Sequence, residues 1–368
     1  MPEAPNRKLK IQPGINPLLV FIGLIAFFAV MYIAKSIIIP IVFATIIAIV
    51  LHPVVNLFVR IRINRILAIT LTLFLSFLLI AAFGTLLFSQ ASTFAESLPN
   101  LADKFTDILN QTVIYISGHF NLSHREITEW ITKTKNELIG KLEIGQTIAN
   151  VGSVVALFFL IPVYVFMILF YQSLLIEFFR RVFGKRHRNK VNTIINQIKT
   201  LIQRYLVGLL IETAMISVMY TVGLLILGID YAIILGLIGA LLNLIPYLGA
   251  IMAASMPMII AINTKSSPWF ALLVLALYLF IQFIDNNYIV PKIVASKVKI
   301  NALASIISII VFGALWGIQG MLIAIPLTAI AKLIFDHVQP LKPWGFLLGD
   351  TMPTKIGFTP VLKKLIRK

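Results

Sequence analysis

Cysteine is absent from this 368-residue chain, and negative charge is scarce. Without cysteine the chain has no disulfide, no thiolate zinc site and no cysteine nucleophile. Charged residues make up only 12% of the chain, about half their usual share in a soluble domain. Hydrophobic residues make up 59%, and the mean hydropathy is +0.97. These values predict an all-α, polytopic helical membrane protein.

Sequence motifs for nucleotide binding and for hydrolysis are also absent. The chain contains no G-x-x-x-x-G-K-[ST], no G-x-S-x-G and no H-E-x-x-H. Its five histidines show no metal-ligand spacing. We therefore expect no enzyme activity, no cofactor and no metal site. Any active transport would use an ion gradient, such as H⁺ or Na⁺, or a partner ATPase.

The net charge of +17 could suggest a nucleic-acid partner. The basic residues, however, gather at the ends of apolar spans, where they set the orientation of a membrane protein. The clusters are Arg7, Lys8 and Lys10; Arg60, Arg62 and Arg65; the run from Arg180 to Lys190; and the run from Lys363 to Lys368. We therefore expect no nucleic-acid partner and a bilayer with anionic headgroups around these residues.

Apolar runs and charge divide the chain into segments. They are a basic cytoplasmic tail, 1–16; spans 1–3 within 17–90, with a tight turn at Lys35 and Ser36; an extracytoplasmic helical segment, 91–148; span 4, 149–171; a cytoplasmic amphipathic basic segment, 172–204; a transport core, 205–338; and a cytoplasmic tail, 339–368. The segment 91–148 is assigned to the outside because it carries seven of the 14 acidic residues. The amphipathic segment is expected to continue into a fifth span that ends near Gly228.

Two long apolar segments of the core, near 231–263 and 302–330, are interrupted by glycine, proline and amide residues. Each could cross the membrane with a kink, or could enter, turn and leave on the same side. Lys292, Lys297 and Lys299 favour the second arrangement, because it keeps their loop cytoplasmic. We therefore expect about six full spans and two broken re-entrant hairpins, a pattern that points to a transport site.

Two small groups of residues would mark the two hairpin tips. Asn243, Pro246 and Gly249 would form the first, because glycine permits close backbone approach and proline frees a carbonyl. The alternative is an ordinary kinked span in which Asn243 bonds to a neighbouring helix. Gln319 and Gly320, with Gly317 and Trp316, would mark the second tip, and the alternative there is glycine-mediated helix packing.

A polar cluster lies between the two broken segments. Its members are Gln282, Asp285, Asn286 and Asn287. Asp285 could carry a proton or hold a cation, since a carboxylate within the membrane is costly unless it is paired, hydrated or protonated. Alternatively, Asp285 lies near the cytoplasmic interface and pairs with Lys292.

A second acidic residue lies in the fifth span. Glu212 follows Arg204 by two helical turns, about 12 Å, which is too far for an easy ion pair within one helix. Glu212 is therefore expected to face another helix or a cavity, with a functional role and a structural one both open. Arg204 either belongs to the site or anchors the helix at the interface. The amides and carboxylates of these candidates suit a small polar solute or a cation.

At these residues the chain resembles the autoinducer-2 exporter family of bacterial inner-membrane transporters. The matching stretches are Asn243-Leu-Ile-Pro246-Tyr-Leu-Gly249, Gln282-Phe-Ile-Asp285-Asn-Asn287 and Trp316-Gly317-Ile-Gln-Gly320. With Arg204-Tyr205 and the acidic insert, the resemblance covers nearly the whole chain. It implies a multi-pass secondary transporter of the bacterial inner membrane, which forms a homo-oligomer with a pentamer as one candidate. It also implies export of a signalling molecule or Na⁺/H⁺ antiport.

The leading hypothesis is thus a secondary transporter of a small polar solute or signalling molecule, working by alternating access coupled to H⁺ or Na⁺. Both termini would be cytoplasmic. The alternatives are a Na⁺/H⁺ antiporter, a passive channel and a membrane scaffold that transports nothing.

Overall fold

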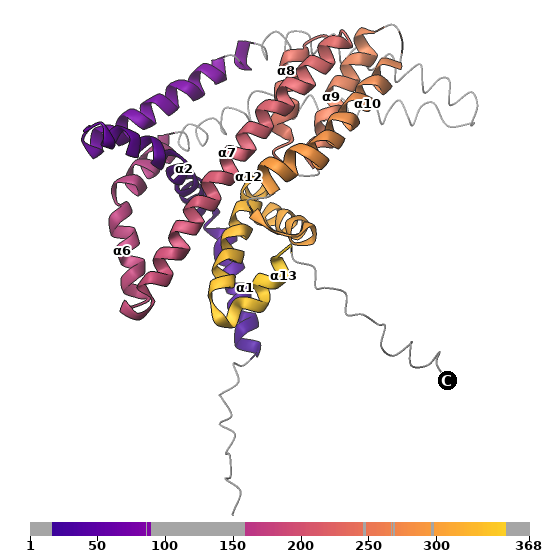
Figure 1. Cartoon of the computed structure of the whole chain (residues 1–368). Coiled ribbons are helices and arrows are strands. Elements are labelled where there is room, and N and C mark those ends of the chain that lie inside the picture. Colours follow the sequence, from indigo (N-terminus) through magenta and orange to yellow (C-terminus); the bar gives the residue numbers. More distant parts are fainter. Residues whose placement is uncertain are drawn as a thin grey trace, which may run out of the picture.

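The computed structural model describes residues 17–85, 87–89, 159–245, 248–265, 267, 269–295 and 298–350 (Figure 1). Over these ranges the chain is helical, and the only β pairing is an isolated bridge between Ile300 and Gly349. The predicted helical class is confirmed. The segment predicted to be extracytoplasmic, 91–148, lies outside the described residues, as do residues 1–16 and 351–368.

Residues 90–158 lie outside the described ranges, and within those ranges the helices follow one another in chain order. They are α1 (Pro17–Ile33), α2 (Lys35–Arg60), the helices Arg65–Ser89 and Phe159–Phe170, α6 (Gln172–Val182), η1 (Lys185–His187), α7 (Arg188–Ile226), α8 (Ala232–Leu242), α9 (Leu248–Thr264), α10 (Trp269–Ile284), the π-helical turns η2 (Asp285–Ile289) and η3 (Pro291–Ala295), α12 (Ala302–His337), η4 (Gln339–Leu341) and α13 (Lys342–Leu348). Among the described residues, five helices are long and apolar enough to span a membrane, or six if one bent pair counts as a span, and the five include α12, which a turn at Gly317 divides. These numbers fit a polytopic membrane protein.

The tight turn predicted at Lys35 and Ser36 is wrong. The amide of Ala34 bonds to the carbonyl of Val30, and the amide of Ile38 bonds to the carbonyl of Ala34, both at 2.9 Å. Helical hydrogen bonding therefore continues past the junction of α1 and α2, and both predicted turn residues lie in the first turn of α2. Neither is a glycine or proline that would favour reversing the chain within two residues.

The longest unbroken helix is α7, which runs beside α6 at its start and beside α8 at its end (Figure 1). Its 39 residues extend for about 58 Å, well beyond the ~30 Å hydrocarbon core of a bilayer. It ends where the sequence indicated, because Gly228 adopts a left-handed conformation with φ of 64°. The amides of Gly228 and Ile229 then bond to the carbonyls of Leu225 and Leu224, which completes a glycine cap.

The first predicted hairpin consists of α8 and α9, which pack against each other. With 11 residues, α8 is about 16 Å long and covers only half of the hydrocarbon core. At the turn, Gly249 lies so close to the backbone of Leu242 and Asn243 that a β-carbon would overlap it. A glycine is therefore required for this reversal, as the sequence indicated. The side of the membrane from which the hairpin enters stays a prediction.

The second hairpin is contained within α12, which folds back at Gly317 (φ 65°, ψ −147°). The hydroxyls of Ser308 and Thr328 are 2.8 Å apart, whereas twenty residues of continuous helix would separate them by about 30 Å. Gly320 then packs against the carbonyl of Phe312 on the opposite arm. The turn thus occurs at Gly317, within the predicted tip, and Gly320 allows the two arms to approach closely.

We expect cysteine labelling to reveal both hairpins, because the natural chain has no cysteine. If the first hairpin enters and leaves on one side, Ser267→Cys will react with an impermeant maleimide from outside the cell. Lys299→Cys, on an exposed position after the next span, will react only from the cytoplasm. The cysteine-free parent chain serves as the background control. Labelling of Ser267→Cys from the cytoplasm and of Lys299→Cys from outside would mean that the two segments are ordinary membrane-crossing spans.

Candidate functional site

Asp285 lies at the point where α10 widens into the π-helical turn η2, and its side chain is only 1% exposed. The amide of Val290 bonds to the carbonyl of Asp285, five residues back, in place of the usual four. Pro291 explains part of this widening, because it has no amide hydrogen and its ring would clash with the carbonyl four residues earlier. Wide turns of this kind are frequent at functional sites.

The tip of the first hairpin closes over this carboxylate. Asn243, at the C-terminal end of α8, donates a hydrogen bond from its amide nitrogen to Asp285 Oδ2 at 3.0 Å. The other carboxylate oxygen, Oδ1, is buried without a hydrogen-bond partner among the described residues. The structure thus brings together two predicted site residues that are 42 positions apart, and it leaves one oxygen atom available to a ligand.

Glu212 contributes a second buried carboxylate from the middle of α7, with a side chain that is 7% exposed. It lies within electrostatic range of Asp285, and the two negative groups would repel each other when both are charged. None of the ion pairs among the described residues involves either carboxylate. Two uncompensated carboxylates in a buried position are unfavourable, so the site is suited to bind a proton or a cation.

Two tyrosines that the sequence analysis did not single out complete the site. The rings of Tyr220 on α7 and Tyr278 on α10 are stacked, with centroids 4.1 Å apart. Both hydroxyls are buried without a hydrogen-bond partner among the described residues, and Tyr220 lies within electrostatic range of Asp285. Gly239 of α8 packs against both rings. A tyrosine within an apolar run is the signal that could have found them, because a buried hydroxyl normally has a partner.

The neighbours of Asp285 in sequence are turned away from it. Asn286 and Asn287 are exposed, and Asn287 donates its amide hydrogen back to the carbonyl of Phe283 at 2.8 Å. Gln282 makes only a long contact with Asn286, 3.4 Å, and its Oε1 is buried without a partner among the described residues. Of the predicted cluster, Asp285 therefore belongs to the buried site, and the two asparagines do not.

The remaining predicted residues are dispersed. Arg204 is exposed on α7, about two helical turns before Glu212, and does not join the carboxylates. Gln319 is also exposed, beside the turn of the second hairpin. Pro246 lies outside the described residues. Arg204 and Gln319 are thus exposed and are not brought together with Asp285 among the described residues, and their roles stay predictions.

The site is therefore made of oxygen atoms held by four helical elements. Its members are Glu212 and Tyr220 from α7, Asn243 from α8, Tyr278 from α10 and Asp285 from η2, and we refer to them as the carboxylate site. Carboxylate, hydroxyl and amide oxygens are ligands that suit hard cations, and a carboxylate can equally accept a proton. The described residues contain no cluster of three metal-ligating side chains of the His, Cys, Asp or Glu type.

Known proteins with similar sequences identify the family of this chain. Residues 21–339 match the family described as AI-2E family transporter. YrrI, a candidate transport protein of Bacillus subtilis (strain 168), is 25% identical over 258 residues, which are 69% of this chain and 71% of YrrI. PerM, a candidate permease of Escherichia coli (strain K12), is 25% identical over 285 residues, 74% of this chain and 78% of PerM.

A third relative carries a substrate in its name. The AI-2 transport protein TqsA of Escherichia coli (strain K12) is 34% identical over 124 residues, which are 34% of this chain and 36% of TqsA. The family match covers most of the chain, including the carboxylate site and both hairpins. This chain belongs to the AI-2E transporter family and is a multi-pass membrane transport protein.

Proposed function

We propose that this chain is a secondary transporter of the bacterial inner membrane that moves a small polar solute or signalling molecule by alternating access. The carboxylate site would take the coupling ion, H⁺ or Na⁺. The observation that carries the proposal is the pair Glu212 and Asp285, which are buried together without a positively charged partner among the described residues. A site that binds an ion only when the hairpin tip is closed links ion binding to conformation.

The first hairpin is the part of the transporter that we expect to move. Asn243 is attached to the short helix α8, and its hydrogen bond to Asp285 connects the tip of the first hairpin to η2. When the carboxylate is occupied, its negative charge is compensated and the closed tip is stabilised. When it is empty, repulsion between the carboxylates favours opening. Broken helices at the centre of a transporter commonly form such ion and substrate sites.

A Na⁺/H⁺ antiporter is the second candidate. An anionic solute would call for a positively charged side chain in the site, and Arg204, the nearest candidate from the sequence, is exposed elsewhere on α7. A site with two carboxylates and no arginine suits the exchange of cations with protons. In either case we propose that the chain works as a homo-oligomer with cytoplasmic termini, and that it does not act as an enzyme.

Flux measurements on the purified chain in liposomes test the proposal. We expect solute uptake that saturates with concentration and reverses direction when the imposed pH or Na⁺ gradient is reversed. The solute panel includes AI-2, because one relative is named for its transport. Proton movement driven by Na⁺ alone, reported by a dye trapped inside the liposomes, would favour the antiporter.

Two results would contradict a carrier. Unitary conductance steps in a planar bilayer would indicate a channel. A folded protein that moves no tested solute or ion, but binds a stable protein partner, would indicate a scaffold. Protein-free liposomes and liposomes with heat-denatured protein are the controls.

A further inference from the structure

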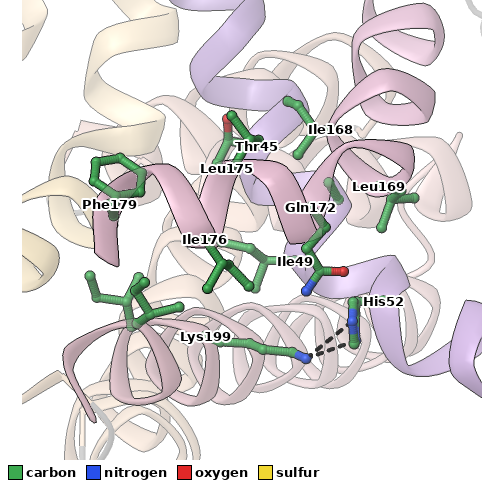
Figure 2. A pocket seen from close by; sticks show the side chains of 13 residues that line it. Thr45, Ile49, His52, Ile168, Leu169, Gln172, Leu175, Ile176, Phe179 and Lys199 are labelled. Carbon is green, nitrogen blue, oxygen red and sulfur yellow. Dashed lines mark hydrogen bonds between the residues drawn. The ribbon is translucent and has the colours of Figure 1, made fainter. Parts of the chain in front are cut away.

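A separate cavity of about 240 Å³ lies between α2, the helix Phe159–Phe170, α6 and α7 (Figure 2). Its walls are almost entirely apolar side chains, among them Ala48, Ile49, Leu169, Ile176 and Ile195. It is smaller than the pockets of about 300–1,000 Å³ that enclose drug-sized ligands. None of the carboxylate-site residues lines it.

One end of the cavity is polar and positively charged. Lys199 of α7 extends towards His52 of α2, with its Nζ 2.8 Å from Nδ1 of the imidazole (Figure 2). A lysine ammonium is a donor only, so Nδ1 accepts this hydrogen bond and the imidazole is neutral. The amide nitrogen of Asn56 lies 3.0 Å from the same Nδ1. The ammonium of Lys199 is therefore hydrogen-bonded to a neutral imidazole rather than balanced by an anion.

The charged residues nearby do not balance the positive charge of Lys199. Arg65 lies within electrostatic range of His52, and its guanidinium donates a hydrogen bond to the carbonyl of Leu169 at 2.8 Å. Glu177 of α6 is engaged elsewhere, with Arg180, Arg181 and Arg188. No ion pair among the described residues includes Lys199. Among the described residues, the polar end of the cavity is thus lined by one cation, Lys199, with Arg65 close to His52, and by no carboxylate.

The location suits a lipid-like molecule. The helix Phe159–Phe170 meets α6 at an angle of 64°, and the cavity lies beside this bend. α6 is amphipathic and ends in basic residues, as expected of a helix at the membrane interface beside an anionic leaflet. A ligand here would place its charged end at headgroup level and its apolar part against the cavity walls.

We propose that this cavity binds the hydrocarbon chain of an anionic amphiphile, whose phosphate or carboxylate contacts Lys199. The charge complementarity at Lys199 and Arg65 selects an anionic headgroup, and the apolar walls select a hydrocarbon chain. A phospholipid such as phosphatidylglycerol and a free fatty acid share this chemistry. The proposal does not depend on which ion or solute the carboxylate site takes.

Native mass spectrometry of the delipidated full-length chain tests the proposal. The probes are phosphatidylglycerol, oleate and, as the neutral comparison, phosphatidylcholine. We expect the wild type to retain one phosphatidylglycerol or oleate about tenfold or more tightly than phosphatidylcholine, the range given by a hydrogen bond to a charged group. Preferential binding of oleate alone would identify a fatty acid as the source, and binding of phosphatidylglycerol would identify a phospholipid.

Two pairs of variants make the test specific. Lys199→Met removes the charge and should abolish the preference for anionic probes, whereas Lys190→Met, on an exposed part of the same helix, should preserve it. Ile176→Trp fills the cavity and should prevent retention of any probe, whereas Leu174→Trp, on the exposed face of α6, should not. Ile176→Trp leaves Lys199 unchanged, so it tests the cavity independently of that residue's role in folding.

Thermal melting provides a second readout. An anionic probe that binds the folded chain should raise the Tm of the wild type and of both control variants, but not of Lys199→Met or Ile176→Trp. The proposal is overturned if Lys199→Met keeps the anionic preference, if Ile176→Trp retains the probe, or if phosphatidylcholine binds as tightly as phosphatidylglycerol and oleate.

Discussion

Proteoliposomes that carry the Asp285→Asn variant are expected to lose the dependence of flux on the ion gradient. Asparagine has the shape of aspartate and can still accept the hydrogen bond from Asn243, so the hairpin tip should remain closed. The variant cannot take up a proton at this position and offers a weaker oxygen ligand to a cation. We expect gradient-driven flux to fall by about tenfold to a hundredfold, the equivalent of losing one interaction with a buried charge.

The matched control is Asp230→Asn, which removes the same charge from an exposed position between α7 and α8. It should leave both the flux and its gradient dependence at wild-type levels. A Tm within a few degrees of the wild type shows that Asp285→Asn is folded. If this variant transports with undiminished gradient dependence, Asp285 is not the coupling residue and the proposed role of the carboxylate site fails.

The Gly249→Ala variant is expected to cause the largest loss of stability of any single added methyl group in the first hairpin. A β-carbon at this position would overlap the carbonyl of Leu242 and approach the α-carbon of Asn243, both of which are backbone atoms. The hairpin would have to open, because backbone cannot rotate away as a flexible side chain can. Overpacking of this kind costs about 1–3 kcal/mol or more. Displacing the tip would also remove Asn243 from Asp285 and impair transport.

Gly84→Ala is the control for this substitution. Gly84 lies in the helix Arg65–Ser89, and a β-carbon there would meet no atom within 4 Å. Because alanine favours helix over glycine by up to about 1 kcal/mol, this variant should be as stable as the wild type or slightly more so. The measurements are the Tm in detergent and the monodispersity on gel filtration. Equal melting temperatures for the two variants would show that the turn tolerates a side chain.

The two hairpins could be predicted from sequence because their interruptions are local. Glycine, asparagine and proline within apolar segments weaken a continuous helix wherever it is placed, so the break points were visible near Asn243 and Gly320. The exact turn of the second hairpin was not, because Gly313, Gly317 and Gly320 are alike in sequence. Only the packing of the two arms, through Ser308 and Thr328, selects Gly317 as the turn.

The composition of the carboxylate site was less predictable. Asp285 could have been an interface residue near Lys292, and its burial depends on Asn243 from a segment 42 positions away. Asn286 and Asn287 looked equally suitable, but the π-helical turn changes the direction in which successive side chains point. Tyr220 and Tyr278 were missed because their hydroxyls become unusual only when both are buried.

The unbroken length of α7 has a mechanical consequence. Lys199 and Glu212 are thirteen residues apart on this helix, about 20 Å, and at 100° per residue they project from faces roughly 140° apart. α7 contains neither a proline nor a break between them. Rotation of α7 about its axis would therefore shift Glu212 against η2 and Lys199 against α2 in the same movement. One continuous helix thus connects the carboxylate site to the cavity beside α6, so we expect a rotation at one end to be transmitted to the other.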